Sequence, residues 1–169
     1  MIDTVLKNEV SELQPKRGLD ESTRRRVAQD LSNVHADAFR LYINVQGLHW
    51  NVEGPLFYSL HKLTEEQYED LAESIDTLAE RVRALGLLAT ESLAAYQERS
   101  IIDDLPQDTS LKQRVERLIS DYERATERIA TAVRTAEENG DVKTADLLTD
   151  RIGTYQENAW MLRATITEA

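Results

Sequence analysis

Cysteine is absent from all 169 residues of the chain. Its absence excludes disulfide bonds, thiolate metal sites and cysteine nucleophiles, and it suits a reducing compartment such as the cytoplasm. The sequence also lacks an apolar run of membrane-spanning length. Its start, MIDTVLKNEVSELQ, shows no basic segment followed by an apolar one, which would mark a secretory signal. We therefore expect a cytoplasmic protein with no membrane partner.

Positive charge is also scarce, because 20 lysines and arginines face 31 acids and leave a formal net charge of −11. This balance argues against a general nucleic-acid binder, since phosphate contacts require clustered cations. It suits a surface that attracts metal cations, although an acidic composition is also common in proteins that are simply soluble.

Four long segments carry apolar residues at alternating steps of three and four, which form one face of an α-helix. The first segment runs from about residue 22 to 49 and ends at the polar loop NVEGP. Gly86 is a plausible C-cap of the second, the third stops at Asn139-Gly140, and Asp141 is a candidate N-cap of the fourth. The periodic residues are Val27, Leu31, Val34, Ala38, Leu41, Val45 and Leu48; Leu60, Leu63, Leu71, Ile75, Leu78, Val82 and Leu85; Leu111, Val115, Leu118, Tyr122, Ala125, Ile129, Ala132 and Ala136; Ala145, Leu148, Ile152, Tyr155, Ala159, Leu162 and Ile166.

No period-two pattern competes with these helices, so the sequence predicts an all-α four-helix bundle. About 20 residues separate the second helix from the third, enough for a crossover that lets these two helices run parallel. A short extra helix is expected in this crossover near Glu91–Glu98. Residues 1–21 show no periodicity and are expected to form a flexible N-terminal tail, which leaves 22–169 as one domain.

The second helix also carries side chains that bind metal ions in other proteins. His61, Glu65, Asp76 and Glu80 lie within an arc of about 100° beside the apolar face. Histidine and carboxylate together suit iron, manganese or zinc. The alternative is an ordinary solvated helix rich in acids, with His61 at the boundary of its apolar face.

The spacing along this helix decides what the row is able to hold. Glu65 and Asp76 lie 11 residues apart, which is roughly 16 Å along a helix, whereas metal–ligand bonds are about 2 Å. Either the two pairs form separate sites, or a second copy of the helix, antiparallel about a two-fold axis, supplies the missing half. His49, at the end of the first helix, is able to approach either the His61–Glu65 pair or the Asp76–Glu80 pair. A di-iron centre within one bundle normally uses Glu-x-x-His pairs, and none of the three histidines has Glu three residues before it.

The stretch LHWNVEGPLFYSLHKLTEEQYEDLAESIDTLAERVRALG resembles the characteristic region of the Dps ferritins, the DNA-protection-during-starvation family. The matching elements are His49-Trp50-Asn51, Gly54, Phe57, His61, Glu65, Asp76, and Ala79-Glu80-Arg81 before Leu85-Gly86. A weaker similarity covers roughly residues 22 to 167, including Ala159-Trp160-Met161-Leu162-Arg163 in the last helix.

This resemblance implies a ferritin-like fold, a homo-oligomeric shell of the dodecamer type and a two-iron ferroxidase centre at the dimer interface. By position, His49, His61 and Glu65 would come from one subunit, and Asp76 and Glu80 from its neighbour; some members have aspartate where Glu65 stands. The implied activity is oxidation of Fe(II) with hydrogen peroxide and storage of Fe(III) mineral, which protects DNA from oxidative damage. The residues themselves do not distinguish peroxide from dioxygen.

Other residues receive roles by the same resemblance. Trp50 would donate electrons beside the iron, or merely anchor the end of the helix. Asp141, Asp146 and Asp150 match acids that line a three-fold pore for iron entry, although acids near a helix N-terminus also complement its dipole. His35 matches no functional position and is interpreted as structural.

Two rival functions remain open. One is a nucleoid-associated, DNA-binding cage with little iron chemistry, for which Arg24, Arg25 and Arg26 form a small basic cluster. Direct DNA binding is disfavoured by the charge of −11 and by a first segment in which acids outnumber cations. The other is a purely structural helical bundle, which explains the apolar segments but leaves the spacing of histidines and acids as coincidence.

Overall fold

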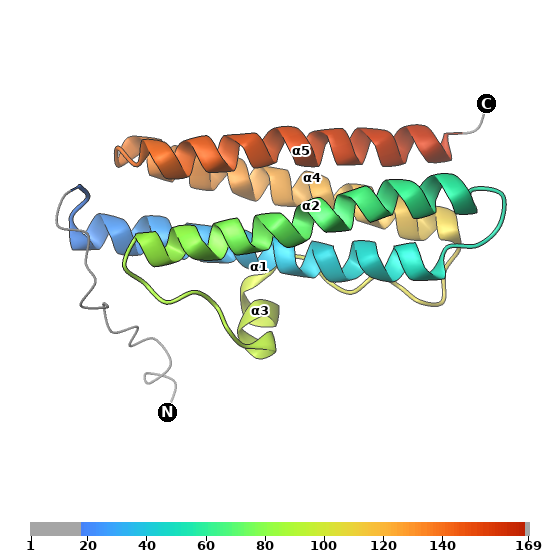
Figure 1. Cartoon of the computed structure of the whole chain (residues 1–169), viewed down its shortest axis with the longest axis horizontal. Coiled ribbons are helices and arrows are strands. Elements are labelled where there is room, and N and C mark those ends of the chain that lie inside the picture. Colours follow the sequence, from blue (N-terminus) through green and yellow to red (C-terminus); the bar gives the residue numbers. More distant parts are fainter. Residues whose placement is uncertain (1–17, 168–169) are drawn as a thin grey trace.

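The computed structural model describes residues 18–167, and this part of the chain contains five helices and no strand. They are α1 (Glu21–Asn51), α2 (Phe57–Ala84), α3 (Leu93–Arg99), α4 (Leu111–Glu138) and α5 (Val142–Ile166). The four long helices lie side by side, and the short α3 lies outside them (Figure 1). The predicted all-α bundle with an extra helix in the crossover is therefore confirmed.

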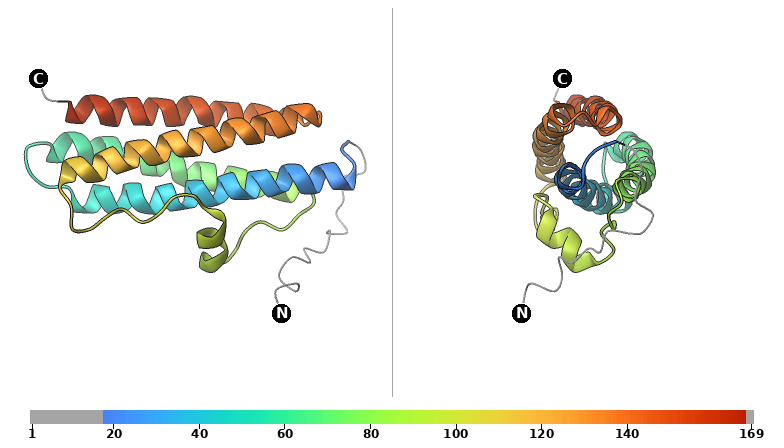
Figure 2. Two further views of the ribbon diagram at one scale, coloured as in Figure 1. Left: turned by 180° about the vertical axis from the view of Figure 1, so that it is seen from behind. Right: turned by 90° about the vertical axis from the view of Figure 1, so that its left-hand side faces the viewer.

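The core lies between the four long helices, which surround it when the molecule is viewed end-on (Figure 2). Leu31, Leu60, Leu118 and Leu148, one from each long helix, are all 0% exposed. Complete burial of a leucine side chain contributes about 1.5–3 kcal/mol, so the apolar face of each helix stabilises the bundle. None of the described helices is long and apolar enough to cross a membrane.

Glycine ends α2 and α4 in the same way. Gly86 and Gly140 have φ of 88° and 73°, a left-handed conformation that favours glycine at this position. After α2, the N–H groups of Gly86 and Leu87 donate to the carbonyls of Arg83 and Val82. The predicted end of the second helix at Gly86 is confirmed, and so is Asp141 as the N-cap of α5.

The chain is fixed to the bundle slightly before the predicted domain start at residue 22. Most of the predicted tail, residues 1–21, lies outside the described residues, but Leu19 packs against the core. Asp20 is the N-cap of α1 and accepts hydrogen bonds from Ser22 Oγ at 2.6 Å and from the Thr23 backbone N–H at 2.9 Å. These two bonds, the one from Ser22 first, lower the pKa of Asp20 to about 2.

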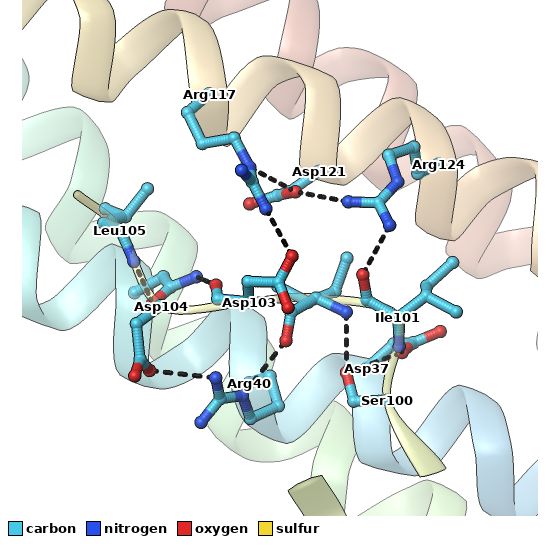
Figure 3. Close-up of polar contacts among 12 residues, drawn as sticks. Asp37, Arg40, Ser100, Ile101, Asp103, Asp104, Leu105, Arg117, Asp121 and Arg124 are labelled. Atoms are coloured by element: carbon cyan, nitrogen blue, oxygen red, sulfur yellow. Dashed lines mark hydrogen bonds and ion pairs between the residues drawn. The ribbon is translucent and has the colours of Figure 1, made fainter. Parts of the chain in front are cut away.

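The crossover between α2 and α4 runs along the outside of α1 and brings the chain back, so that α2 and α4 run parallel (Figures 1 and 2). Polar side chains of α1 and α4 hold its backbone in place, as Figure 3 shows. Asn44 donates to the carbonyl of Asp103 at 2.8 Å, and Arg124 donates to that of Ile101 at 2.6 Å. Asp37, only 1% exposed, accepts from the Ile101 N–H at 2.9 Å. The crossover is therefore a fixed part of the fold.

Candidate metal centre

Two histidines meet where α1 turns into α2. His49 lies in the last turn of α1 and His61 in the first turns of α2, and the short loop after Asn51 folds the two helices back on each other (Figure 1). Their rings are stacked, with centroids 3.9 Å apart and planes inclined by 18°. Of the two halves that His49 was expected to approach, the structure places it beside His61.

The hydrogen bonds of the two rings are reciprocal. His49 Nδ1 lies 2.8 Å from the carbonyl oxygen of His61, and His61 Nδ1 lies 3.1 Å from that of His49. A carbonyl oxygen only accepts, so each Nδ1 must carry the hydrogen. In the neutral imidazoles Nε2 then keeps its lone pair, which is the arrangement found in metal-binding histidines. Backbone carbonyls thus fix the orientation of both rings and leave each Nε2 as the nitrogen with a free lone pair.

Glu65 adds a carboxylate one turn after His61. Its Oε2 lies 2.5 Å from Nζ of Lys62, and its side chain is 32% exposed. The hydrogen bond from Lys62, followed by the charge of Lys62, lowers the pKa of Glu65. Glu65 is therefore an anionic carboxylate one helical turn from His61, paired with Lys62.

Asp76 and Glu80 lie on the other half of α2, one turn apart, and both are exposed. Because α2 continues without a break from Phe57 to Ala84, the calculated separation of roughly 16 Å between Glu65 and Asp76 holds. Within residues 18–167 of one chain, no three histidine, aspartate or glutamate side chains come together as a metal site. Within one chain, the candidate residues therefore lie in two separate groups, His49, His61 and Glu65 near the turn between α1 and α2, and Asp76 and Glu80 farther along α2.

Aromatic rings line the histidine pair. Phe57 stacks on His61 with centroids 5.0 Å apart, and Tyr68 meets His49 edge to face at 5.1 Å. Sequence reasoning missed Tyr68, although its position two helical turns after His61 is the signal that indicates it. Trp50, by contrast, is 68% exposed.

The three acids assigned to a pore differ from one another in the structure. Asp141 is 5% exposed; its carboxylate pairs with Arg81 at 2.7 Å and accepts from the N–H and hydroxyl of Thr144. Asp146 and Asp150 are exposed. The charge of Asp141 is therefore already compensated within the subunit, a contact between α2 and α5 that sequence reasoning did not anticipate.

The remaining candidates lie in ordinary structural environments. His35 is 1% exposed and packs edge to face against Tyr96 of α3, and burial lowers its pKa. In the basic cluster, Arg24 is 7% exposed and donates to the carbonyl of Leu19, while Arg25 pairs with Glu21 at 2.8 Å. Arg24 and Arg25, two of the three arginines considered for DNA contact, thus stabilise the start of α1.

The fold agrees with that of known proteins to which the sequence is similar. The sequence matches the family described as "Ferritin-like domain" over residues 28–169. DNA protection during starvation protein 2 of Bacillus anthracis is 31% identical over 144 residues, which cover 85% of this chain and 99% of that protein. The crystal structure of Dps from Thermosynechococcus elongatus is 30% identical, with a TM-score of 0.84 over 88% of this chain and 94% of that one.

The Dps protein of Vibrio cholerae, described as a member of a broad superfamily of ferritin-like diiron-carboxylate proteins, is similar as well. It is 29% identical and has a TM-score of 0.85 over 93% of this chain and 99% of that one. Fold and sequence together define a ferritin-like protein. Within that class, the chain belongs to the Dps family.

Proposed function

We propose that this protein is an iron-storage ferroxidase whose catalytic sites form between two subunits. The observation that carries the proposal is the stacked pair of His49 and His61, with both Nδ1 atoms bound to carbonyls and Glu65 one turn away. Two nitrogen ligands and one carboxylate suit iron. Completing the site requires the two acids at the far end of α2, which only a neighbouring chain is able to bring there.

In the proposed assembly, two copies of α2 lie antiparallel about a two-fold axis. Asp76 and Glu80 of the partner subunit then face the histidine pair of the first, and the symmetry creates two identical sites. Repetition of this contact in a dodecameric cage, as the resemblance to Dps implies, would enclose a cavity for the mineral. Storage of Fe(III) there removes iron from reactions that damage DNA.

Two Fe(II) ions in one site are able to reduce hydrogen peroxide by two electrons together. Each Fe(II) gives one electron, the O–O bond breaks, and two protons complete two molecules of water, so that no hydroxyl radical is released. Anionic oxygen from Glu65 and from the partner subunit's acids stabilises Fe(III) more than Fe(II), which favours the oxidation. Trp50, which follows His49 in the chain and is 68% exposed, is a candidate electron donor through its resemblance to the family position.

Replacement of both histidines by alanine is the direct test. The His49→Ala/His61→Ala variant is expected to lose peroxide-driven Fe(II) oxidation down to the rate of iron free in solution, because both nitrogen ligands are gone. Initial Fe(III) absorbance would be measured on assemblies whose mass is known from size exclusion with light scattering. Glu66→Ala is the matched control, since Glu66 is exposed and adjacent to Glu65. Unchanged rates in the histidine variant would remove both residues from the mechanism.

Iron entry is proposed to use the exposed acids at the start of α5. Repeated around a three-fold axis, Asp146 and Asp150 would focus a negative potential that attracts Fe(II), with Asp141 mainly capping α5 and holding Arg81. The Asp146→Asn/Asp150→Asn variant is expected to take up Fe(II) more slowly. Because salt screens exposed charges, the difference from wild type should shrink as ionic strength rises. A difference that does not depend on salt would contradict an electrostatic entry route.

A further inference from the structure

Tyr68 occupies a distinctive place beside the proposed iron site. Its ring lies 5.1 Å from that of His49, with the planes at 73°. The ring of Tyr42 from α1 also lies near Tyr68, with centroids 6.3 Å apart and planes at 81°. Tyr42 is held in turn by Gln46, whose Nε2 donates to the Tyr42 hydroxyl at 3.0 Å. A phenol is thus packed directly against a proposed iron ligand, with a second phenol in contact with the first.

The side chain of Tyr68 is only partly exposed, and its ring packs on that of His49. Trp50 differs from Tyr68 both in its exposure and in its direction. It is 68% exposed, and as the neighbour of His49 in a helix it points about 100° away from it.

We propose that Tyr68 is the residue that supplies a single electron and a proton when a site reacts with peroxide while it holds only one Fe(II). This inference rests on the proposed ferroxidase function, because it concerns the same site. It assigns to a phenol within the ligand cluster the protective role that the sequence had suggested for Trp50.

The chemistry balances in two steps. A lone Fe(II) passes one electron to hydrogen peroxide, whose O–O bond breaks to hydroxide and a hydroxyl radical, and the iron becomes Fe(III). Tyr68 then gives its phenolic hydrogen, one electron with one proton, to the hydroxyl radical. Water and a tyrosyl radical result, and the oxidising equivalent stays on the protein instead of diffusing to DNA or to the mineral surface.

The test compares Tyr68→Phe with wild type, because phenylalanine keeps the ring that packs against His49 and removes only the phenol. Fe(II) would be added without oxygen at fewer ions than sites, followed by hydrogen peroxide and rapid freezing. Electron paramagnetic resonance would measure the tyrosyl radical, and a spin trap would measure escaping hydroxyl radical. Tyr58→Phe is the control, since Tyr58 lies near the site in sequence but is 74% exposed, and Trp50→Phe tests the competing donor.

Wild type is expected to show a tyrosyl radical, and Tyr68→Phe to lose most of that signal while its spin-trap signal rises. Tyr58→Phe should resemble wild type in both the tyrosyl-radical signal and the spin-trap signal. Fe(III) formation with excess Fe(II) should be the same in Tyr58→Phe as in wild type, since paired iron needs no extra electron. Radical and spin-trap signals unchanged in Tyr68→Phe, with Fe(III) formed normally, would overturn the role of Tyr68 alone. Wild type that forms no Fe(III) with peroxide would overturn the proposed function, and this inference with it.

Discussion

Two variants, one without His49 and His61 and the other without Asp76 and Glu80, are expected to be inactive alone, because every site has lost one half of its ligands. Assemblies formed from equal amounts of both are expected to recover roughly a quarter of the wild-type ferroxidase rate. Recovery on mixing is the largest effect that the two-subunit site predicts.

The expected fraction follows from two-fold symmetry. When unlike subunits meet, one of the two sites combines both defects, and the other combines intact histidines with intact acids. Random pairing makes roughly half of the interfaces unlike, and half of the sites in each are intact, which gives roughly one quarter. A site built within one chain would give no recovery, because every chain in the mixture is defective.

The measurement is the initial rate of peroxide-driven Fe(III) formation by cages reassembled from the two purified variants. Native mass spectrometry would establish that both subunits are present in one particle. Each variant taken through the same reassembly alone is the control. Mixed cages without activity, at a subunit ratio near unity, would contradict the sharing of ligands between chains.

Loss of the Asp37 carboxylate is expected to destabilise the fold by about 2–4 kcal/mol, because a buried acceptor shared by an arginine and two further donors is removed. Asp37 is 1% exposed and binds Arg128 of α4 with Oδ1–NH1 and Oδ2–NH1 distances of 3.1 and 3.0 Å. The same carboxylate accepts from Ser100 Oγ at 2.8 Å and from the Ile101 N–H at 2.9 Å. Asp37→Ala therefore leaves a cation, a hydroxyl and a backbone donor without their acceptor.

A second ion pair of the same crossover supplies the matched control. Asp104 pairs with Arg40 at 2.9 Å, but its side chain is 82% exposed, and such surface pairs contribute about 0–1 kcal/mol. Urea unfolding at one fixed subunit concentration would compare Asp37→Ala, Asp104→Ala and wild type. Equal losses in the two variants would show that the Asp37 cluster does not hold the crossover in place.

The helices of this protein were predictable because their causes are local. An apolar face repeats every three or four residues whatever lies opposite, and a glycine such as Gly86 ends a helix through its own backbone conformation. The roles of Leu19 and Asp20 were not predictable in this way. They belong to no periodic pattern, and packing on the core and capping α1 depend on their neighbours.

The spacing along α2 predicted that Glu65 and Asp76 of one chain do not bind the same ion, because the rise of a helix is fixed at about 1.5 Å per residue. That argument needed only the positions of Glu65 and Asp76. It did not reveal that His49 and His61 stack and fix each other's tautomers, since those bonds join two helices through a loop. Which half of the row His49 joins was likewise decided by the turn between the helices.

The sequence by itself determined four amphipathic helices, their ends, and a ligand row too long for one metal ion, because all three depend on helical periodicity and rise. Tertiary structure alone decided the partners of particular polar side chains. It paired Asp141 with Arg81, fixed the crossover on Asp37, and packed Tyr68 against His49. The physical reason is that such contacts join distant segments, and their geometry depends on how whole helices pack.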